Sequence, residues 1–321
     1  MKTIIRKFSA AFLISISLFS AAGPAIAEAT DKLVIDPVLE QAVFSTPESA
    51  AQTITDAIFD RDREKISLIL GLNTTALLPL DNIKPEAVDK YLAAFSASHT
   101  LEPAGNDRYL LAVGKDNWTL PIPIVKGSQG WYFDAEDGIE RIRIRRIGRN
   151  ELATMQAVLA YYDAQFEYAA EDRNNNGVLE YAQQFISSNN EKNGLYWETS
   201  AGGPPSPLGP LFAEAKPEDA YHGYYYRILA SQGEQAKSGA YSYLIDDHMT
   251  AGFALIAWPA EYGNTGVMSF MVNQDGIVYQ QDLGPDTAEI ALVMQSFNPA
   301  ATWVPVQEVH GPQPEAKSSS K

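Results

Sequence analysis

Residues 152–169, LATMQAVLAYYDAQFEYA, decide how the second half of this chain folds. Their apolar spacing of three and four residues predicts an amphipathic helix, and an apolar stripe of this kind is a core-facing surface rather than a cofactor site. The sequence Gly148-Arg-Asn-Glu151 directly before them indicates that the helix opens at about residue 148. The stripe predicted to face the core consists of Leu152, Met155, Leu159, Tyr162, Phe166 and Ala169.

Directly after this helix, side-chain oxygens stand at alternate positions in Asp172-Arg-Asn174-Asn-Asn176-Gly-Val178-Leu-Glu180. A calcium-binding loop places oxygen ligands at positions 1, 3 and 5, glycine at 6, a backbone carbonyl at 7 and an acid at 9 or 12. Position 12 is Gln183, so the bidentate glutamate is absent. We therefore predict a weak Ca²⁺ site, with Kd on the order of 10⁻⁴ to 10⁻³ M. Its ligands would be Asp172, Asn174, Asn176, the Val178 carbonyl and Glu180.

The same loop has a metal-free interpretation as a turn that ends the long helix. Asparagine tolerates left-handed backbone geometry, and an aspartate such as Asp172 bonds its own backbone in such turns. Mg²⁺ suits the loop less well because it demands tight octahedral coordination. The sequence leaves the calcium and metal-free interpretations open.

Downstream of a Pro/Gly-rich stretch at 202–210, the chain is rich in aromatic segments with the two-residue period of strands. Asn273-Gln-Asp-Gly276 is a hairpin turn signal between the last two of them. We expect one long helix packed on an antiparallel sheet, over residues 148–306. The predicted strands are 221–229, 241–245, 253–258, 267–272 and 276–280.

Helical segments come first in the preceding unit, residues 44–147, and strands follow. Ser45-Thr-Pro-Glu48 is a helix start signal, and Pro85-Glu86 begins a later helix. Strands are expected at 109–113, 118–125 and 130–134, so the fold class is α+β. This order of elements resembles the cone-shaped nuclear-transport-factor-2 fold. The basic run at 141–149 alternates at first like a strand with its charges on one face. These charges have two interpretations: they pair with nearby acids, or they dock an anion or a partner.

The ends of the chain differ from these two units. Residues 1–27 carry Lys2, Arg6 and Lys7, an apolar stretch at 8–22 and Ala25-Ile-Ala27, which predicts a signal peptide cleaved after Ala27 and a periplasmic or secreted protein. That apolar stretch of about 15 residues is shorter than the roughly 20 of a membrane span, so no span is expected. Residues 28–43 are predicted to be a disordered leader and 307–321 a disordered tail.

Composition excludes several function classes. The chain has 321 residues and no cysteine, so neither a disulfide framework nor thiolate chemistry is available. Removing the three basic residues of the signal changes the formal net charge from −16 to −19. Nucleic acid is therefore an unexpected partner, because phosphate binding requires a basic surface.

No motif of a serine hydrolase, zinc hydrolase or nucleotide-binding enzyme occurs in the sequence. The alternative catalytic candidates are His222, Glu261 and Tyr226, which would line an aromatic cleft with Trp258 and other tyrosines. Glu261 with Asp275 or Asp246 could form a carboxylate pair for glycoside cleavage, although spacing in sequence does not fix their separation. The simpler interpretation is a sheet face whose tyrosines pack through their rings.

Residues 148–282 resemble the globular part of bacterial pilins and pseudopilins, although a whole domain precedes the helix here. Across residues 44–306 the chain is similar to a family of secreted bacterial proteins called domain of unknown function 2950. That resemblance implies an exported protein of unassigned activity and brings no catalytic residues. It is carried by Phe44-Ser-Thr-Pro-Glu48, Gly130-Trp-Tyr-Phe-Asp134, Gly148-Arg-Asn-Glu151, Gly177-Val-Leu-Glu-Tyr-Ala182, Tyr221-His-Gly-Tyr-Tyr225, Trp258-Pro-Ala-Glu-Tyr262 and Asn273-Gln-Asp-Gly276.

These observations favour an exported, non-enzymatic binding or envelope-structural protein, with calcium as an expected stabilising ion. Its partner would be an envelope protein or a polysaccharide, and the sequence does not determine the oligomeric state. The alternative is a hydrolase or sugar-active enzyme that uses carboxylates and His222.

Overall fold

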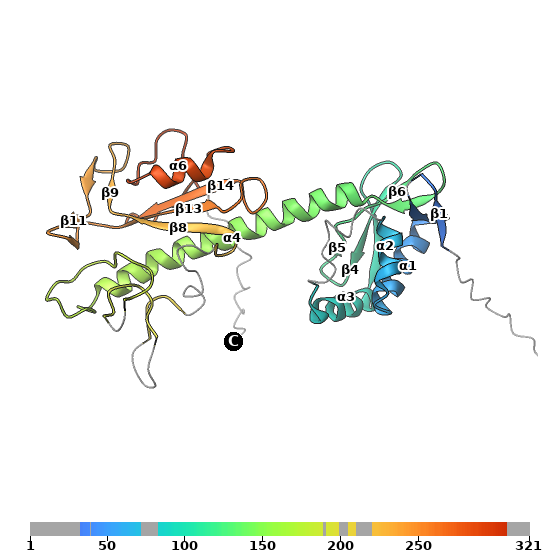
Figure 1. The fold of residues 1–321 in the computed structure, drawn as a ribbon, viewed down its shortest axis with the longest axis horizontal. Coiled ribbons are helices and arrows are strands. Elements are labelled where there is room, and N and C mark those ends of the chain that lie inside the picture. The colour runs from blue at the N-terminus through green and yellow to red at the C-terminus, as the bar shows by residue number, and fades with distance from the viewer. Residues whose placement is uncertain are drawn as a thin grey trace, which may run out of the picture.

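The structure is a computed structural model that describes residues 33–38, 40–71, 83–188, 191–198, 205–209 and 220–306. The predicted signal peptide and C-terminal tail lie outside the described residues. Two units of mixed helix and antiparallel sheet lie at the two ends of one long helix, α4 (Ala135–Ala169), as Figure 1 shows. The predicted α+β class is confirmed.

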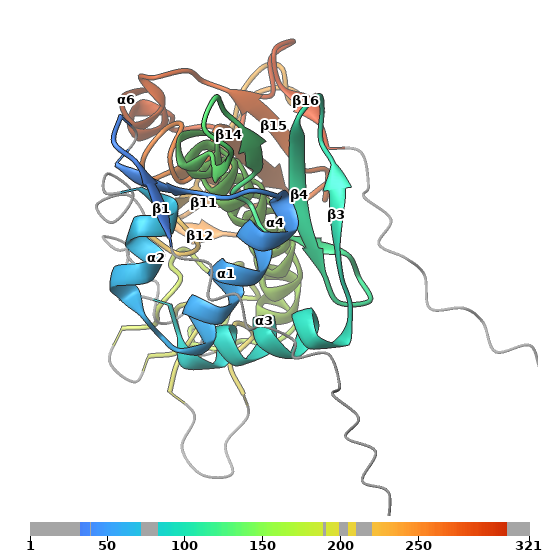
Figure 2. The ribbon, with the colours of Figure 1, turned by 90° about the vertical axis from the view of Figure 1, so that its right-hand side faces the viewer.

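The N-terminal unit packs helices against a sheet in the order β3-β4-β6-β7, with β5 paired to β4. Figure 2 shows this unit end-on, with its helices gathered together. The prolines at 121 and 123 separate β5 from β6, where one continuous strand was predicted. The elements are β1 (Val34–Asp36), β2 (Gln41–Val43), α1 (Pro47–Phe59), α2 (Arg63–Leu70), α3 (Pro85–Ala97), β3 (His99–Pro103), β4 (Arg108–Val113), β5 (Trp118–Thr119), β6 (Ile124–Lys126) and β7 (Trp131–Phe133).

The predicted disordered leader is wrong for residues 34–36 and 41–43, which pair as the antiparallel strands β1 and β2. Phe44, directly after β2, exchanges backbone hydrogen bonds with Trp131 at 2.7 and 2.8 Å and so joins the hairpin to β7. The Gln41 amide donates to the Ile69 and Phe133 carbonyls at 2.8 and 2.7 Å. Because these bonds satisfy a buried polar side chain, the segment is ordered despite its weak apolar pattern.

Helix α4 begins at Ala135, well before the predicted start near residue 148, so the basic run is helical despite its strand-like alternation. Asp134 caps the helix by accepting from the Asp137 amide at 3.1 Å. Acids one turn earlier pair with the arginines, as Glu140 does with Arg143 at 2.6 Å. The predicted boundary between residues 147 and 148 lies inside this helix.

The core-facing stripe of α4 is also different from the predicted one. Leu152, Leu159 and Phe166 are 48%, 44% and 42% exposed. The buried face is shifted by one or two positions from the predicted stripe. It includes polar residues, such as Gln165, which a prediction from apolar spacing leaves out. Gln165 is satisfied because its amide donates to the Ala182 carbonyl at 2.8 Å. The buried residues are Thr154, Ala157, Val158, Tyr161, Ala164, Gln165 and Tyr168.

The C-terminal unit contains a sheet in the order β16-β15-β14-β13-β8, antiparallel throughout. Helix α4 contacts β14 and β13, and α6 lies on the opposite side of the sheet in Figure 1. The elements are β8 (Tyr224–Leu229), β9 (Ser231–Gln232), β10 (Tyr241–Ser242), β11 (Leu244–Ile245), β12 (His248–Met249), β13 (Ala254–Pro259), β14 (Met268–Asn273), β15 (Tyr279–Asp282), α6 (Thr287–Val293) and β16 (Val304–Pro305).

Arginines in the middle of α4 bind both units. Arg145 donates to the Thr119 carbonyl and hydroxyl at 2.6 and 2.7 Å. On the other side, Arg143 donates to the Gly263 carbonyl and Arg146 to the Asn264 side chain. The helix is therefore attached to the sheet of the first unit and to the β13–β14 loop of the second. In the described ranges, no helix combines the length and apolarity that crossing a bilayer requires.

Candidate functional site

The loop that follows α4 is held by its own side chains. The Asp172 carboxylate accepts from the backbone amides of Asn176 and Gly177 at 3.1 and 2.9 Å. The Asn176 side-chain oxygen accepts from the Val178 amide at 2.9 Å. Gly177 has a φ of 87° and Asn175 a φ of 57°, values that glycine and asparagine adopt readily. The chain therefore curls around the Asp172 carboxylate.

Glu180 lies at the inner side of this loop and is only 7% exposed. One carboxylate oxygen accepts from the side-chain amides of Asn174 and Asn176 at 2.9 and 2.5 Å. The other is 3.0 Å from Nδ1 of His248, which belongs to β12. Burial favours the protonated carboxyl, but the hydrogen bonds from the two asparagines and His248 outweigh it, so the pKa of Glu180 lies below its ordinary value.

The loop thus brings the predicted ligands Asp172, Asn174, Asn176 and Glu180 into one cluster. The Asn174 side-chain oxygen also accepts from backbone, from the Asn176 amide at 3.3 Å, so both asparagine oxygens bond backbone while their amide nitrogens donate to Glu180, as the metal-free turn requires. A calcium ion would need those amide oxygens and the Val178 carbonyl turned toward it. The described part of the chain contains no group of three or more His, Cys, Asp or Glu side chains that could hold a metal. Calcium binding stays a prediction.

A polar cavity of about 300 Å³ lies beside the loop. Asn174 and Glu180 belong to both the loop and the cavity wall. Tyr181 connects this region to the β11–β12 hairpin, because its amide donates to the Met249 carbonyl at 2.8 Å. The remaining lining residues are Tyr168, Gln183, Gln184 and Asn193.

Sequence reasoning missed His248. It lies 68 residues from Glu180 in the chain, and no spacing or motif connects the two. The connection depends on how the β11–β12 hairpin is placed against the loop, which is a tertiary feature.

In the alternative catalytic trio, His222 lies in the turn before β8, Tyr226 in β8 itself and Glu261 in the β13–β14 loop. His222 is exposed, with a φ of 50°, and its ring lies next to that of Tyr221, tilted by 59° with the ring centroids 4.2 Å apart. The Tyr226 hydroxyl donates to the Thr154 hydroxyl at 3.3 Å, and the Glu261 carboxylate accepts from the Asn264 amide at 2.5 Å. The side chains of Tyr226 and Glu261 therefore bond neighbours outside the trio, and His222 contacts Tyr221.

The surroundings of the trio resemble a packed sheet. Tyr224 and Trp258, expected to line an aromatic cleft, are buried in the core of the C-terminal unit. Burial raises the pKa of Tyr226 above its ordinary value, which makes its hydroxyl a neutral hydrogen-bond donor at physiological pH. Neither cavity described for this protein is lined by a member of the trio.

The fold and this loop define an α+β protein without a recognisable catalytic centre in its described residues. The chain belongs to a family: the family model described as "Protein of unknown function (DUF2950)" matches residues 41–306. No curated protein matches this chain. No solved structure matches it either.

Proposed function

We propose that this protein is exported and acts without catalysis, as a binding or structural module of the cell envelope. The observation that carries the proposal is α4, one continuous helix that forms part of both units. A helix of 35 residues is roughly 52 Å long at 1.5 Å per residue. A body of this kind presents two surfaces at a fixed separation, which suits a spacer or a two-point binder.

The finer fold likenesses belong to the same proposal. A nuclear-transport-factor-2-like first unit and a pilin-like second unit could both act as modules that bind a protein or a small ligand, because neither fold requires enzymatic activity. The packing of α4 on an antiparallel sheet supports the pilin likeness. The proposed partners are an envelope protein or a polysaccharide.

Calcium enters as a proposed stabilising ion at the loop of Asp172 and Glu180. Extracytoplasmic calcium loops of low ligand charge bind in the millimolar range. Support comes from the Asp172 carboxylate, which already organises the loop as the first ligand position would.

The proposal is tested by substituting Gly148, which lies on α4 with no heavy atom within 4 Å of where a side chain would begin. Gly148→Pro would break the helix because proline removes a hydrogen bond and clashes with the preceding turn. Gly148→Ala leaves it intact. Tagged, full-length versions are expressed in the producing bacterium, cross-linked and recovered from the envelope fraction.

We expect wild type and Gly148→Ala to appear in the envelope fraction with an N-terminus at Glu28 and to cross-link the same partner. Gly148→Pro should be exported equally but lose that partner. Retention of the intact precursor in the cytosol would refute export. Equal partner recovery with both substitutions would refute the role of the rigid connection.

A further inference from the structure

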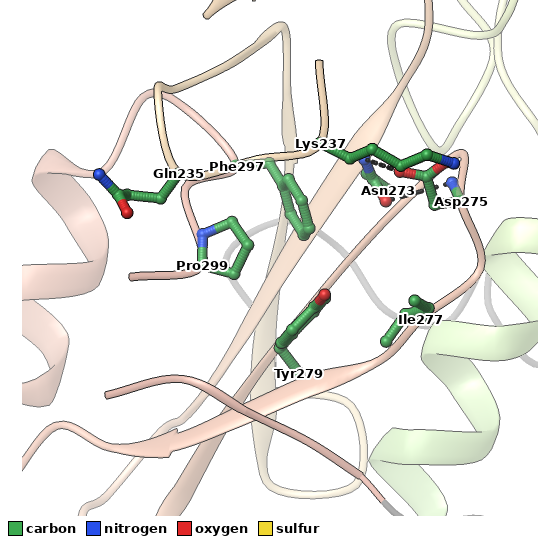
Figure 3. Close-up of a pocket in the computed structure, with 8 residues that line it drawn as sticks. All are labelled: Gln235, Lys237, Asn273, Asp275, Ile277, Tyr279, Phe297 and Pro299. Atoms are coloured by element: carbon green, nitrogen blue, oxygen red, sulfur yellow. Dashed lines mark hydrogen bonds and ion pairs between the residues drawn. The ribbon is translucent and has the colours of Figure 1, made fainter. Parts of the chain in front are cut away.

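We propose that the C-terminal unit binds a single neutral sugar ring in a cavity between the β14–β15 hairpin, the β9–β10 turn and the segment after α6. This inference rests on the proposed binding function and gives it a ligand class. The cavity, shown in Figure 3, has a volume of about 190 Å³. Sites for drug-sized molecules are larger, at roughly 300 Å³ or more, so the space suits one small ring.

The cavity has an aromatic floor. Phe297 is buried, and Tyr279 at the start of β15 is half-buried. Their ring centroids lie 5.9 Å apart at 66°, so the two rings meet edge to face. The negative face of an aromatic ring attracts the weakly positive C–H groups of a sugar ring. Ile277 extends this apolar side in Figure 3.

Polar groups of both kinds lie on the other side. Lys237 Nζ is 3.3 Å from the Asp275 carboxylate, which pairs a donor with an acceptor and leaves no net charge. The buried Asn273 side chain accepts from the Asp275 amide at 3.1 Å and fixes the turn. Sugar hydroxyls both donate and accept hydrogen bonds, so they can bond both members of this ion pair. An anionic ligand would be repelled by the carboxylate of Asp275, and a cationic ligand by the ammonium group of Lys237.

The Tyr279 hydroxyl supplies a further contact. In Figure 3 it points toward the space between Phe297 and Ile277. Within the described ranges it has no hydrogen-bond partner, unlike the buried Tyr224 hydroxyl, which donates to the Met268 carbonyl at 2.9 Å. A polar group directed into a partly enclosed space can therefore bond a ligand without losing a protein contact.

Binding without cleavage follows from the charges. Glycoside hydrolysis uses two carboxylates, roughly 5 to 9.5 Å apart. Asp275 is the one acid in the cavity lining among the residues that the structure describes. The expected ligand is therefore a free sugar or the terminal unit of a polysaccharide.

Neutral hexoses, N-acetylhexosamines and free amino acids are titrated one at a time into the mature protein, followed by saturation-transfer NMR and calorimetry. We expect one sugar class to bind with a millimolar Kd. Tyr279→Phe and Asp275→Asn should each weaken it about fivefold, the loss of one hydrogen bond worth about 1 kcal/mol.

Matched controls come from the same unit, where the Tyr262 hydroxyl donates to Asp282 at 3.3 Å outside the cavity. Tyr262→Phe and Asp282→Asn should leave sugar affinity unchanged, and thermal melts confirm that every variant is folded. Binding of amino acids instead of sugars, no binding at all, or equal losses in the control variants would overturn the proposal. None of these outcomes bears on export or on partner recovery, which test the proposed function separately.

Discussion

At the scale of single residues, Gly266 has less room for a side chain than any other glycine that the structure describes, because Tyr224 packs against it. Tyr224 is fully buried, and its hydroxyl reaches the Met268 carbonyl across the β13–β14 loop. A side-chain carbon at position 266 would collide with that hydroxyl and with the ring. Glycine is required here for space, which locks the loop against β8.

Gly266→Ala should therefore lower the free energy of unfolding by about 2–4 kcal/mol, since overpacking costs 1–3 kcal/mol and the displaced hydroxyl loses a hydrogen bond. Urea unfolding followed by tryptophan fluorescence measures the change. Gly209→Ala is the control, because no atom lies within 4 Å of its added carbon. Equal stability of the two variants would show that the Tyr224 packing is wrong.

Calcium is tested at the same scale. With Kd near 1 mM, 10 mM calcium should stabilise the folded protein by about 1.4 kcal/mol, because only the folded loop gathers the ligands. We expect the midpoint of a thermal melt to rise by about 3–6 °C relative to excess chelator.

Asp172→Asn and Glu180→Gln should remove this calcium response, since each takes away one of the two full charges of the loop. Asp163→Asn, an exposed acid on α4, serves as the matched control. A midpoint that is the same with millimolar calcium and with chelator would leave the metal-free turn as the only interpretation.

At the scale of elements, replacing glycine with alanine should have opposite effects on stability at two positions of α4. A carbon added at Gly138 would lie 2.7 Å from Ile122 Cγ1, whereas Gly148 has open space. Gly148→Ala should stabilise by about 0.8–1 kcal/mol through helix propensity. Gly138→Ala gains the same propensity but overpacks by about 1–3 kcal/mol, so we expect a net loss of about 1 kcal/mol. Urea unfolding of both variants measures the two changes in the free energy of unfolding. If both substitutions stabilise the protein, Ile122 does not pack against Gly138.

The existence of most elements follows from the sequence, but the extent of α4 does not. Thr46 and Asp62 cap helices α1 and α2 as local signals require. The strand-like alternation at 141–149 covers too few residues to outweigh acids placed three and four positions before the arginines, which stabilise a helix. The buried stripe was misassigned because Thr154 and Gln165 are polar.

The candidate site divides in the same way. The Asp172 turn is local, and the metal-free interpretation of the sequence, in which Asp172 bonds its own backbone, describes the hydrogen bonds that hold it. The contact of Glu180 with His248 and the cavity around Tyr279 are assembled from distant segments, so periodicity and motifs carry no signal for them. Contacts between residues close in the sequence can be predicted from one sequence, whereas contacts between distant segments depend on how the elements pack.

At the scale of the whole molecule, the α+β class and the two-unit count are visible in the sequence, but the connection between units is not. A sequence-derived boundary assumes a linker, and here that boundary falls inside a helix whose arginines reach Thr119 on one side and Asn264 on the other. The helix buries residues in the C-terminal unit and Gly138 in the N-terminal unit. Disrupting it should therefore change the packing of both units.

A distance measurement between the units tests this coupling, and the absence of cysteine makes specific labelling simple. Spin labels are placed at Lys90→Cys on α3 and Glu289→Cys on α6, both exposed helical positions. We expect one narrow distance distribution that is unchanged by Gly148→Ala. Gly148→Pro should broaden or shift it, since proline kinks a helix interior at a cost of about 3 kcal/mol. A broad distribution in the parent protein would mean that α4 bends in solution and that the two units do not keep a fixed separation.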